Sequence, residues 1–264
     1  MNPKIKVGGL RMNYKFNVEK ATNECIDWIK EWFDKNGPSC KAVVGISGGK
    51  DSSVVAALCA EALGKDRVLG VLMPQGTQSD IDDAYQLCDH LGIDHITVDI
   101  APAIRALKHQ IKPELGDHWS LQTSINLPPR IRMATLYAVS QTVNGRVIGT
   151  GNLSENYIGY FTRWGDGSSD CEPLGQLTVQ EVKAIGHYLK LPSNLVDKTP
   201  ADGLCGKSDE DSLGFSYEIL DKYIRAEECV HEEVLALIKE LRTKNLFKQP
   251  VLPTYYPSLE ALYG

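Results

Sequence analysis

The 264-residue sequence contains no long apolar run, and this shortage excludes two classes of protein. No window approaches the roughly 18 consecutive apolar residues of a membrane span. The N-terminal stretch MNPKIKVGGLRMNYKF lacks the apolar core of a secretory signal. The composition, with 42% hydrophobic and 23% charged residues, is typical of a globular protein rather than a disordered chain. We therefore expect a cytoplasmic protein with no membrane partner.

Cysteine, histidine and positive charge are also in short supply. The seven cysteines are too sparse for a disulfide scaffold, are odd in number and form no C-x-x-C pair. The six histidines are scattered without the spacing of a zinc site. A formal net charge of −6, from 28 basic and 34 acidic residues, argues against a long nucleic-acid interface. Chemistry on a small molecule is favoured.

The chain alternates short apolar runs with amphipathic segments. Expected strands cover residues 41–46, 68–73, 95–100 and 146–150, and expected helices cover 18–35, 54–64, 80–91, 102–111 and 128–143. Successive strand–helix units predict an α/β fold with a doubly wound parallel sheet flanked by helices. Residues 178–190, 216–225 and 229–242 predict a helical C-terminal part. We find no domain boundary and expect a single domain over residues 1–264, with a glycine-rich working loop at 159–170 and a linker at 198–211.

The strongest motif is the run G-I-S-G-G-K-D-S from Gly45 to Ser52, between the first of these strands and its helix. Consecutive glycines let backbone N–H groups turn inward around an anion, and the helix adds its positive N-terminal end. Ser47 can donate a hydroxyl hydrogen bond, and Asp51 can hold a Mg²⁺ that offsets phosphate charge. A tight turn with serine as helix cap would explain the glycines but not the acid beside two hydroxyls.

The motif fits neither G-x-x-x-x-G-K-[ST] nor G-x-G-x-x-G. It resembles the SGGxDS loop of the N-type ATP pyrophosphatases, the PP-loop superfamily, which has an adenine nucleotide alpha hydrolase-like fold. The blocks at 149–177 and 209–224 are similar to ammonia-dependent NAD synthetases, in matching order from about residue 20 to residue 225. The resemblance implies a carbon–nitrogen ligase that uses ATP and ammonia to amidate deamido-NAD (nicotinate adenine dinucleotide) to NAD. The reaction would pass through an adenylated intermediate and release AMP and pyrophosphate.

The same resemblance implies roles for individual residues. Asp51 and Glu155 would bind Mg²⁺, and Asp166 would bind ammonium and help to deprotonate it. Residues expected to contact deamido-NAD are Arg130, Arg163 and Asp170. Residues expected to bind ATP are Gly45, Ile46, Ser47, Gly48, Gly49, Lys50, Asp51, Ser52 and Thr150. Local sequence also allows simpler readings: Glu155 as a first-turn helix acid, Asp166 as part of an Asp-Gly turn, and the arginines as solvated surface charges.

Two single positions and one pair of residues depart from the family pattern. Val179 stands where relatives carry an ATP-contacting lysine, and Ala201 stands where a threonine or serine follows K-x-P. Lys50, or Lys183 further along the chain, would restore the missing charge. Near the C-terminus, Lys244 and Lys248 replace a His-Lys pair that we expect in the family.

The resemblance also bears on assembly and on competing functions. The family pattern predicts a homodimer, and because only 46 residues precede Ser47 we expect free ammonia or a separate protein to supply the nitrogen. Two alternatives stay open: a PP-loop enzyme that adenylates tRNA or another carboxylate, and an ATP-binding relative that has lost turnover. The acidic balance and the missing C-x-x-C argue against tRNA as the substrate.

Overall fold

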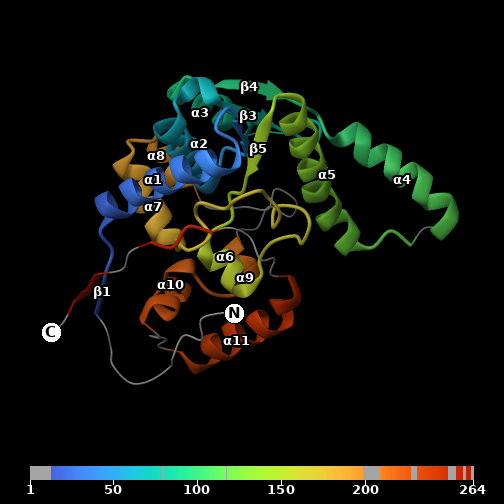
Figure 1. Ribbon diagram of the computed structural model, residues 1–264. Coiled ribbons are helices and arrows are strands. Elements are labelled where there is room, and N and C mark those ends of the chain that lie inside the picture. The colour runs from blue at the N-terminus through green and yellow to red at the C-terminus, as the bar shows by residue number, and fades with distance from the viewer. Residues whose placement is uncertain are drawn as a thin grey trace.

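A computed structural model of the chain has a four-stranded sheet at its centre (Figure 1). The residues that it describes are 13–78, 80–116, 118–198, 209–226, 231–248, 254–257 and 260–262. The strands are β2 (Lys41–Gly45), β3 (Val68–Leu72), β4 (Asp94–Thr97) and β5 (Gly145–Ile148), all parallel and in the order β4-β3-β2-β5. The predicted parallel sheet is confirmed, with strand ends within three residues of those expected.

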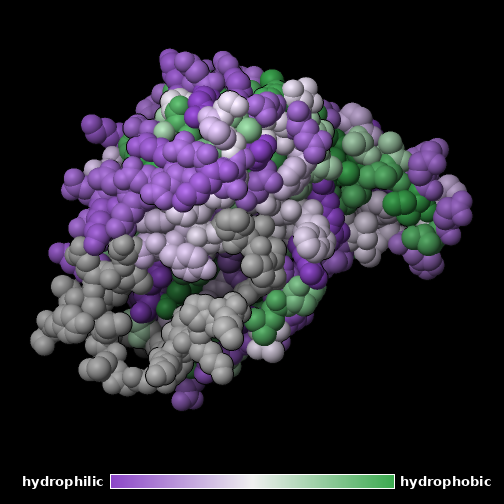
Figure 2. Space-filling view, in the orientation of Figure 1, coloured by the Kyte–Doolittle hydropathy of each residue, from purple (hydrophilic) through white to green (hydrophobic). Residues whose placement is uncertain are grey.

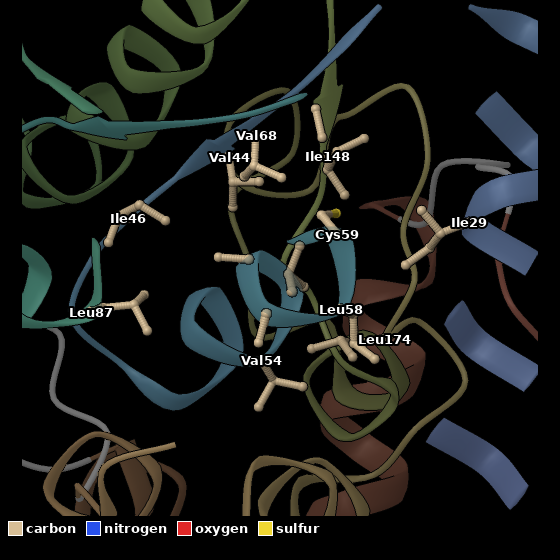
Figure 3. Packing of buried hydrophobic residues seen from close by; sticks show 14 of the residues in the cluster. Ile29, Val44, Ile46, Val54, Leu58, Cys59, Val68, Leu87, Ile148 and Leu174 are labelled. Carbon is tan, nitrogen blue, oxygen red and sulfur yellow. The ribbon is translucent and has the colours of Figure 1, made fainter. Parts of the chain in front are cut away.

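Alternate residues of the central strands face two separate hydrophobic clusters, as the pleat of a strand requires. Val44 of β2 and Ile148 of β5 belong to the larger cluster, together with Val54 and Leu58 (Figure 3). The helices that pack around this cluster are α1 (Val18–Asn36), α2 (Lys50–Leu63), α3 (Ile81–Leu91), α7 (Val179–Tyr188) and α8 (Ser193–Val196). Burial on both faces explains why these strands read as continuous apolar runs.

The opposite face of the sheet is covered by α4 (Ala101–Leu115) and α5 (Leu121–Thr142). Val43 and Val147 point toward this side, where they pack with Met133 and Leu136 of α5. The far end of α4 projects from the body as an arm (Figure 1). Helices on both faces make the sheet doubly wound, as predicted.

A third hydrophobic cluster lies below the sheet and includes two of the three predicted C-terminal helices, α10 (Tyr217–Ala226) and α11 (Glu232–Asn245), whereas the helix predicted at 178–190 is α7 and packs mainly in the larger cluster (Figure 1). The short helices α6 (Leu153–Ile158) and α9 (Asp209–Leu213) also contribute to the third cluster. Two short 3-10 helices (Lys65–Arg67 and Leu246–Lys248) and a small antiparallel pair of β1 (Asn13–Lys15) with β6 (Glu260–Leu262) complete the described elements. No helix among the described residues is long and apolar enough to cross a membrane.

Two expectations about local structure are wrong. The helix expected to begin at Pro128 begins at Leu121, because the hydroxyl of Ser120 caps it by accepting from the Thr123 N–H at 3.1 Å. Pro128 and Pro129 therefore lie inside α5. The expected linker at 198–211 ends in a helix, α9, whose first three residues are acidic, as is favourable at the start of a helix. Residues 199–208 of this expected linker, which include Ala201, lie outside the described part of the chain.

Candidate functional site

The site lies at the carboxyl ends of β2 and its neighbour β5, the two strands between which the order of the sheet reverses. From β2 the chain winds outward to β3 and β4, and then returns to the other side of β2 as β5. Val44 pairs with Ile148, so the loop after Gly45 and the loop after Ile148 leave the sheet side by side. Open α/β sheets bind ligands in the crevice at this kind of reversal. The predicted ATP-binding residues, from Gly45 to Ser52 and Thr150, are thereby brought together.

The conformation of the loop after β2 is stabilised by hydrogen bonds of its own serine hydroxyls. The Ser47 and Ser52 oxygens lie 3.1 Å apart, and the Gly49 N–H donates to Ser47 Oγ at 3.3 Å. Gly48 has φ 78, and a Cβ there would lie 2.9 Å from the Cβ of Asp83 in α3, so only glycine fits without strain. Helix α2 starts at Lys50 with no side-chain cap, which leaves its first N–H groups for a ligand anion.

One asparagine connects the two predicted magnesium ligands. The side-chain amide of Asn152 donates to Asp51 Oδ1 at 3.0 Å, and the Asn152 backbone N–H donates to Glu155 Oε2 at 3.2 Å. The Glu155 N–H donates back to Asn152 Oδ1, which completes a capping box at the start of α6. Asn152 is fully buried, so it fixes the carboxylates of two different loops relative to each other.

The site is strongly acidic and contains one buried ammonium group. Lys50 Nζ lies 2.8 Å from Asp51 Oδ2, and its side chain is only 2% exposed. The pKa of Glu155 is raised well above its usual value by burial and by the charge of Asp51. Lys50 partly offsets this effect, and it also feels the charge of Asp209 from α9. Two hard carboxylate donors that repel each other are a suitable partial ligand set for Mg²⁺, which takes its remaining ligands from water and phosphate. Among the residues described, no group of three or more His, Cys, Asp or Glu could hold a metal without such help.

The glycine-rich loop at 159–170 forms a compact turn around Asp166. Asp166 Oδ1 accepts from the Thr162 N–H at 3.0 Å, and the surrounding protein raises the pKa of Asp166 by desolvation. The charges of Arg132 and Lys248 face this carboxylate. Lys248 also donates to the carbonyl of Gly159 at 3.0 Å, so the C-terminal lysine does reach this loop.

The three residues predicted to contact deamido-NAD have partners within the 159–170 loop or in β5 and α5. Arg130 is held against the loop by a hydrogen bond from its Nε to the Arg163 carbonyl at 3.2 Å. The Arg163 guanidinium lies over the Trp164 ring, and its buried Nε has no hydrogen-bond partner. Asp170 accepts from the Val147 N–H and from Tyr137, so its carboxylate braces the loop against β5 and α5. The position of Asp170 therefore indicates a structural role at the least.

Sequence reasoning missed four residues of the site. Asn152 had a readable signal, because an asparagine three residues before a glutamate marks a helix start. Asp209 and Tyr217 lie in the block 209–224 that carries part of the family resemblance, but nothing in that block showed that they would lie near Asp51, because their docking depends on the tertiary fold. Glu172, buried beside Asn156, stood in a loop without periodicity.

Glu172 gives a testable pH dependence. Burial raises its pKa from 4.5 to about 7, so between these pH values the folded chain keeps a proton that the unfolded chain releases. Stability must then fall as pH rises through this window. Glu172→Gln keeps an oxygen for the Asn156 amide and removes the ionisation. The free energy of unfolding of Glu172→Gln, relative to that of the wild type, should therefore increase by up to about 3 kcal/mol when the pH is raised from 4.5 to 8.

Denaturant unfolding at the two pH values measures this difference, with Glu61→Gln on the exposed side of α2 as the control. Other buried acids titrate in both proteins and cancel in the comparison. Equal pH profiles for Glu172→Gln and the wild type would contradict the prediction.

Together, the doubly wound sheet and the SGGxDS-type loop at its reversal point define a PP-loop α/β enzyme. A sequence model described as NAD synthase matches residues 21–251, most of the chain. The chain belongs to the NAD synthase family, whose members are carbon–nitrogen ligases.

Individual relatives agree with this assignment. The chain is 43% identical over 213 residues to an NH(3)-dependent NAD(+) synthetase of Methanosarcina acetivorans, covering 79% of this chain and 82% of the relative. It is 35% identical over 239 residues to one of Carboxydothermus hydrogenoformans, covering 90% and 97%. The predictions of family, fold class and enzyme class are confirmed, and NAD synthesis from ammonia is the activity for which these relatives are named.

Two solved structures have the same fold as this chain, and they are named for different activities. An NMN synthetase from Francisella tularensis superposes with a TM-score of 0.82 at 32% identity, over 91% of this chain and 99% of that one. An NH3-dependent NAD synthetase from Campylobacter jejuni, in complex with the nitrate ion, superposes with a TM-score of 0.71 at 32% identity, over 89% and 96%.

Proposed function

We propose that this chain amidates the nicotinate carboxylate of deamido-NAD, with ATP and ammonia as cosubstrates. The carboxylate attacks the α-phosphate, forms an acyl-adenylate and releases pyrophosphate. Ammonia then attacks the acyl carbon, AMP leaves, and NAD is formed. The observation that supports this best is the meeting of the Gly45–Ser52 loop with Asp51 and Glu155 at the reversal point of the sheet.

The protein's own groups have defined tasks in this scheme. The loop N–H groups and the hydroxyls of Ser47 and Ser52 bind the departing pyrophosphate, while Asp51 and Glu155 hold Mg²⁺. When bound, Mg²⁺ supplies positive charge where phosphate charge develops. Asp166 takes the proton of ammonium, and its raised pKa supports that role because it makes the carboxylate a stronger base.

The test is a complete reaction with ATP, Mg²⁺, ammonium and deamido-NAD. NAD, AMP and pyrophosphate should appear in equal amounts, and without ammonium the enzyme should still exchange labelled pyrophosphate into ATP. A chain that binds ATP but forms no AMP with any carboxylate would be the non-catalytic relative. AMP formation with a tRNA and not with deamido-NAD would overturn the proposal in favour of the other PP-loop reading.

A second candidate substrate is the mononucleotide, nicotinate mononucleotide, which the same chemistry would convert to NMN. The Francisella structure titled NMN synthetase favours it, with the higher TM-score of the two solved structures compared above. The departures at Lys244 and Lys248, where dinucleotide contacts were expected, point the same way. Parallel measurements of kcat/KM for the two carboxylates decide between them.

Lys50 is the group that we propose to supply the charge missing at position 179. Val179 is 2% exposed inside the C-terminal cluster, whereas Lys50 places its ammonium beside Asp51. We expect Lys50→Ala to raise the ATP concentration needed for half-maximal rate by about tenfold or more, because one charge-assisted contact to phosphate is lost. Lys183→Ala, which changes a partly exposed lysine of α7, is the matched control. An unchanged ATP requirement in Lys50→Ala would reject the role.

We further propose a homodimer in which a second copy covers the arm formed by α4 and the start of α5. The arm carries exposed apolar side chains, seen as a green patch in Figure 2, and among them Leu107, Leu115 and Leu121 are 39%, 61% and 75% exposed. Apolar groups in contiguous patches are typical of interaction surfaces. Light scattering on the purified protein should give twice the 29.1 kDa chain mass.

A further inference from the structure

Tyr217 has a buried hydroxyl that makes no hydrogen bond. The residue opens α10 and is only 1% exposed. Within the described ranges, its hydroxyl and Arg163 Nε are the two buried side-chain polar atoms that lack a partner. Buried polar groups are nearly always paired in native proteins because an unpaired one costs stability, so this hydroxyl requires an explanation.

The surroundings of Tyr217 differ on its two sides. One side belongs to the C-terminal hydrophobic cluster, with Leu213 and Leu220. On the other, the ammonium of Lys50 lies 5.9 Å from the ring centroid, and that ammonium is paired with Asp51. The residue therefore stands at the boundary between a core and the site that holds the phosphates.

The phenol stays protonated and acts as a hydrogen-bond donor. Burial, followed by the charges of Glu155 and Asp209, raises its pKa far above the usual value. The charges of Glu155, Asp209 and Asp51 act on this phenol, but its hydroxyl makes no hydrogen bond to any of these carboxylates. The acceptor that is missing must arrive from outside the chain.

We propose that the Tyr217 hydroxyl donates a hydrogen bond to an oxygen of the bound magnesium–nucleotide, which makes Tyr217 a further catalytic residue. This inference rests on the proposed function, because it needs ATP phosphates beside Asp51. Asp51 would hold the Mg²⁺ and supply the charge that fixes the phosphates near the Tyr217 ring, where the Lys50 ammonium lies 2.8 Å from Asp51 Oδ2 and 5.9 Å from the ring centroid. The oxygen belongs either to a phosphate or to a water of the metal.

Tyr217→Phe removes only this hydroxyl, and Tyr223→Phe on the same helix is the control. Without ligand, Tyr217→Phe should melt at the wild-type temperature or above it, because an unpaired polar atom is lost. The apparent Kd for Mg·ATP, read from the thermal shift, should rise about tenfold, and kcat/KM should fall by a similar factor. Tyr223→Phe should change neither ligand measurement.

Measurements in EDTA distinguish the two sources of the oxygen. Weaker binding of ATP both with and without Mg²⁺ indicates a phosphate oxygen, and weaker binding only with Mg²⁺ indicates a metal-bound water. Wild-type affinity and kcat/KM in Tyr217→Phe would overturn the inference, whatever its melting temperature. Failure of the proposed function would give a different result. The wild-type protein would form no AMP, while Tyr217→Phe would still weaken the binding of Mg·ATP in the thermal-shift measurement.

Discussion

Asp51→Asn should lower AMP and pyrophosphate formation on the order of a thousandfold, because the substitution removes one of the two carboxylates that we propose as ligands of Mg²⁺ at the phosphates. The change keeps the shape of the side chain, and an asparagine oxygen can still accept from the Asn152 amide. The effect should therefore appear in turnover and in the Mg²⁺ concentration required, more than in folding. Initial rates over a range of Mg²⁺ concentrations measure it.

The same substitution has a second consequence that is electrostatic. The charge of Asp51 is one of the two main reasons that the pKa of Glu155 is raised, so Glu155 should titrate at lower pH in Asp51→Asn. Asp27→Asn, which removes an exposed partner of Lys30, is the control and should leave the rates unchanged. Activity of Asp51→Asn within tenfold of the wild type would contradict the assignment of Asp51 to the metal.

The centre of the sheet was predictable because β2 and β3 are short apolar runs buried on both faces. Residues 41–45 and 68–72 have no exposed position at all, so their hydrophobicity marks them without help from the rest of the fold. β4 was found although its residues are exposed, because it follows a helix that ends at Gly92 in the left-handed conformation. The start of α5 was misjudged because prolines favour a first turn, whereas here the cap at Ser120 decides.

The site was predictable only where a motif is local. Asp51 sits inside the glycine loop and could be chosen from that motif, whereas Glu155 was chosen because the block at 149–177 resembles the family. Tyr217 reaches them only because α10 packs against α6 and α7 far along the chain. The hydrophobic periodicity of the sequence does not predict which helices pack against each other. The groups that surround the two carboxylates therefore had to come from the structure.

Arg225→Met should destabilise the protein by about 3–5 kcal/mol, because it removes the guanidinium that compensates the buried charge of Glu181. Arg225 Nε donates to Glu181 Oε1 at 2.7 Å, and the guanidinium also donates to the Gln176 carbonyl at 2.8 Å. The side chains are 13% and 5% exposed, so water cannot replace the lost partner. Methionine preserves most of the packing of the arginine stem, which confines the loss to the charge and its hydrogen bonds.

Denaturant unfolding gives the size of the effect, and Lys222→Met is its matched control on the same helix. Lys222 pairs with Glu218 in an exposed position, where such a pair contributes little, so this change should cost less than about 1 kcal/mol. Adding Glu181→Gln to Arg225→Met should recover part of the stability, since no buried charge then remains. A double variant no more stable than Arg225→Met alone would show that lost packing, and not the loss of charge compensation at Glu181, is the cause.

Because this ion pair joins α7 to α10, Arg225→Met should also loosen the position of Tyr217 and lower the affinity for Mg·ATP, even at temperatures where the chain stays folded.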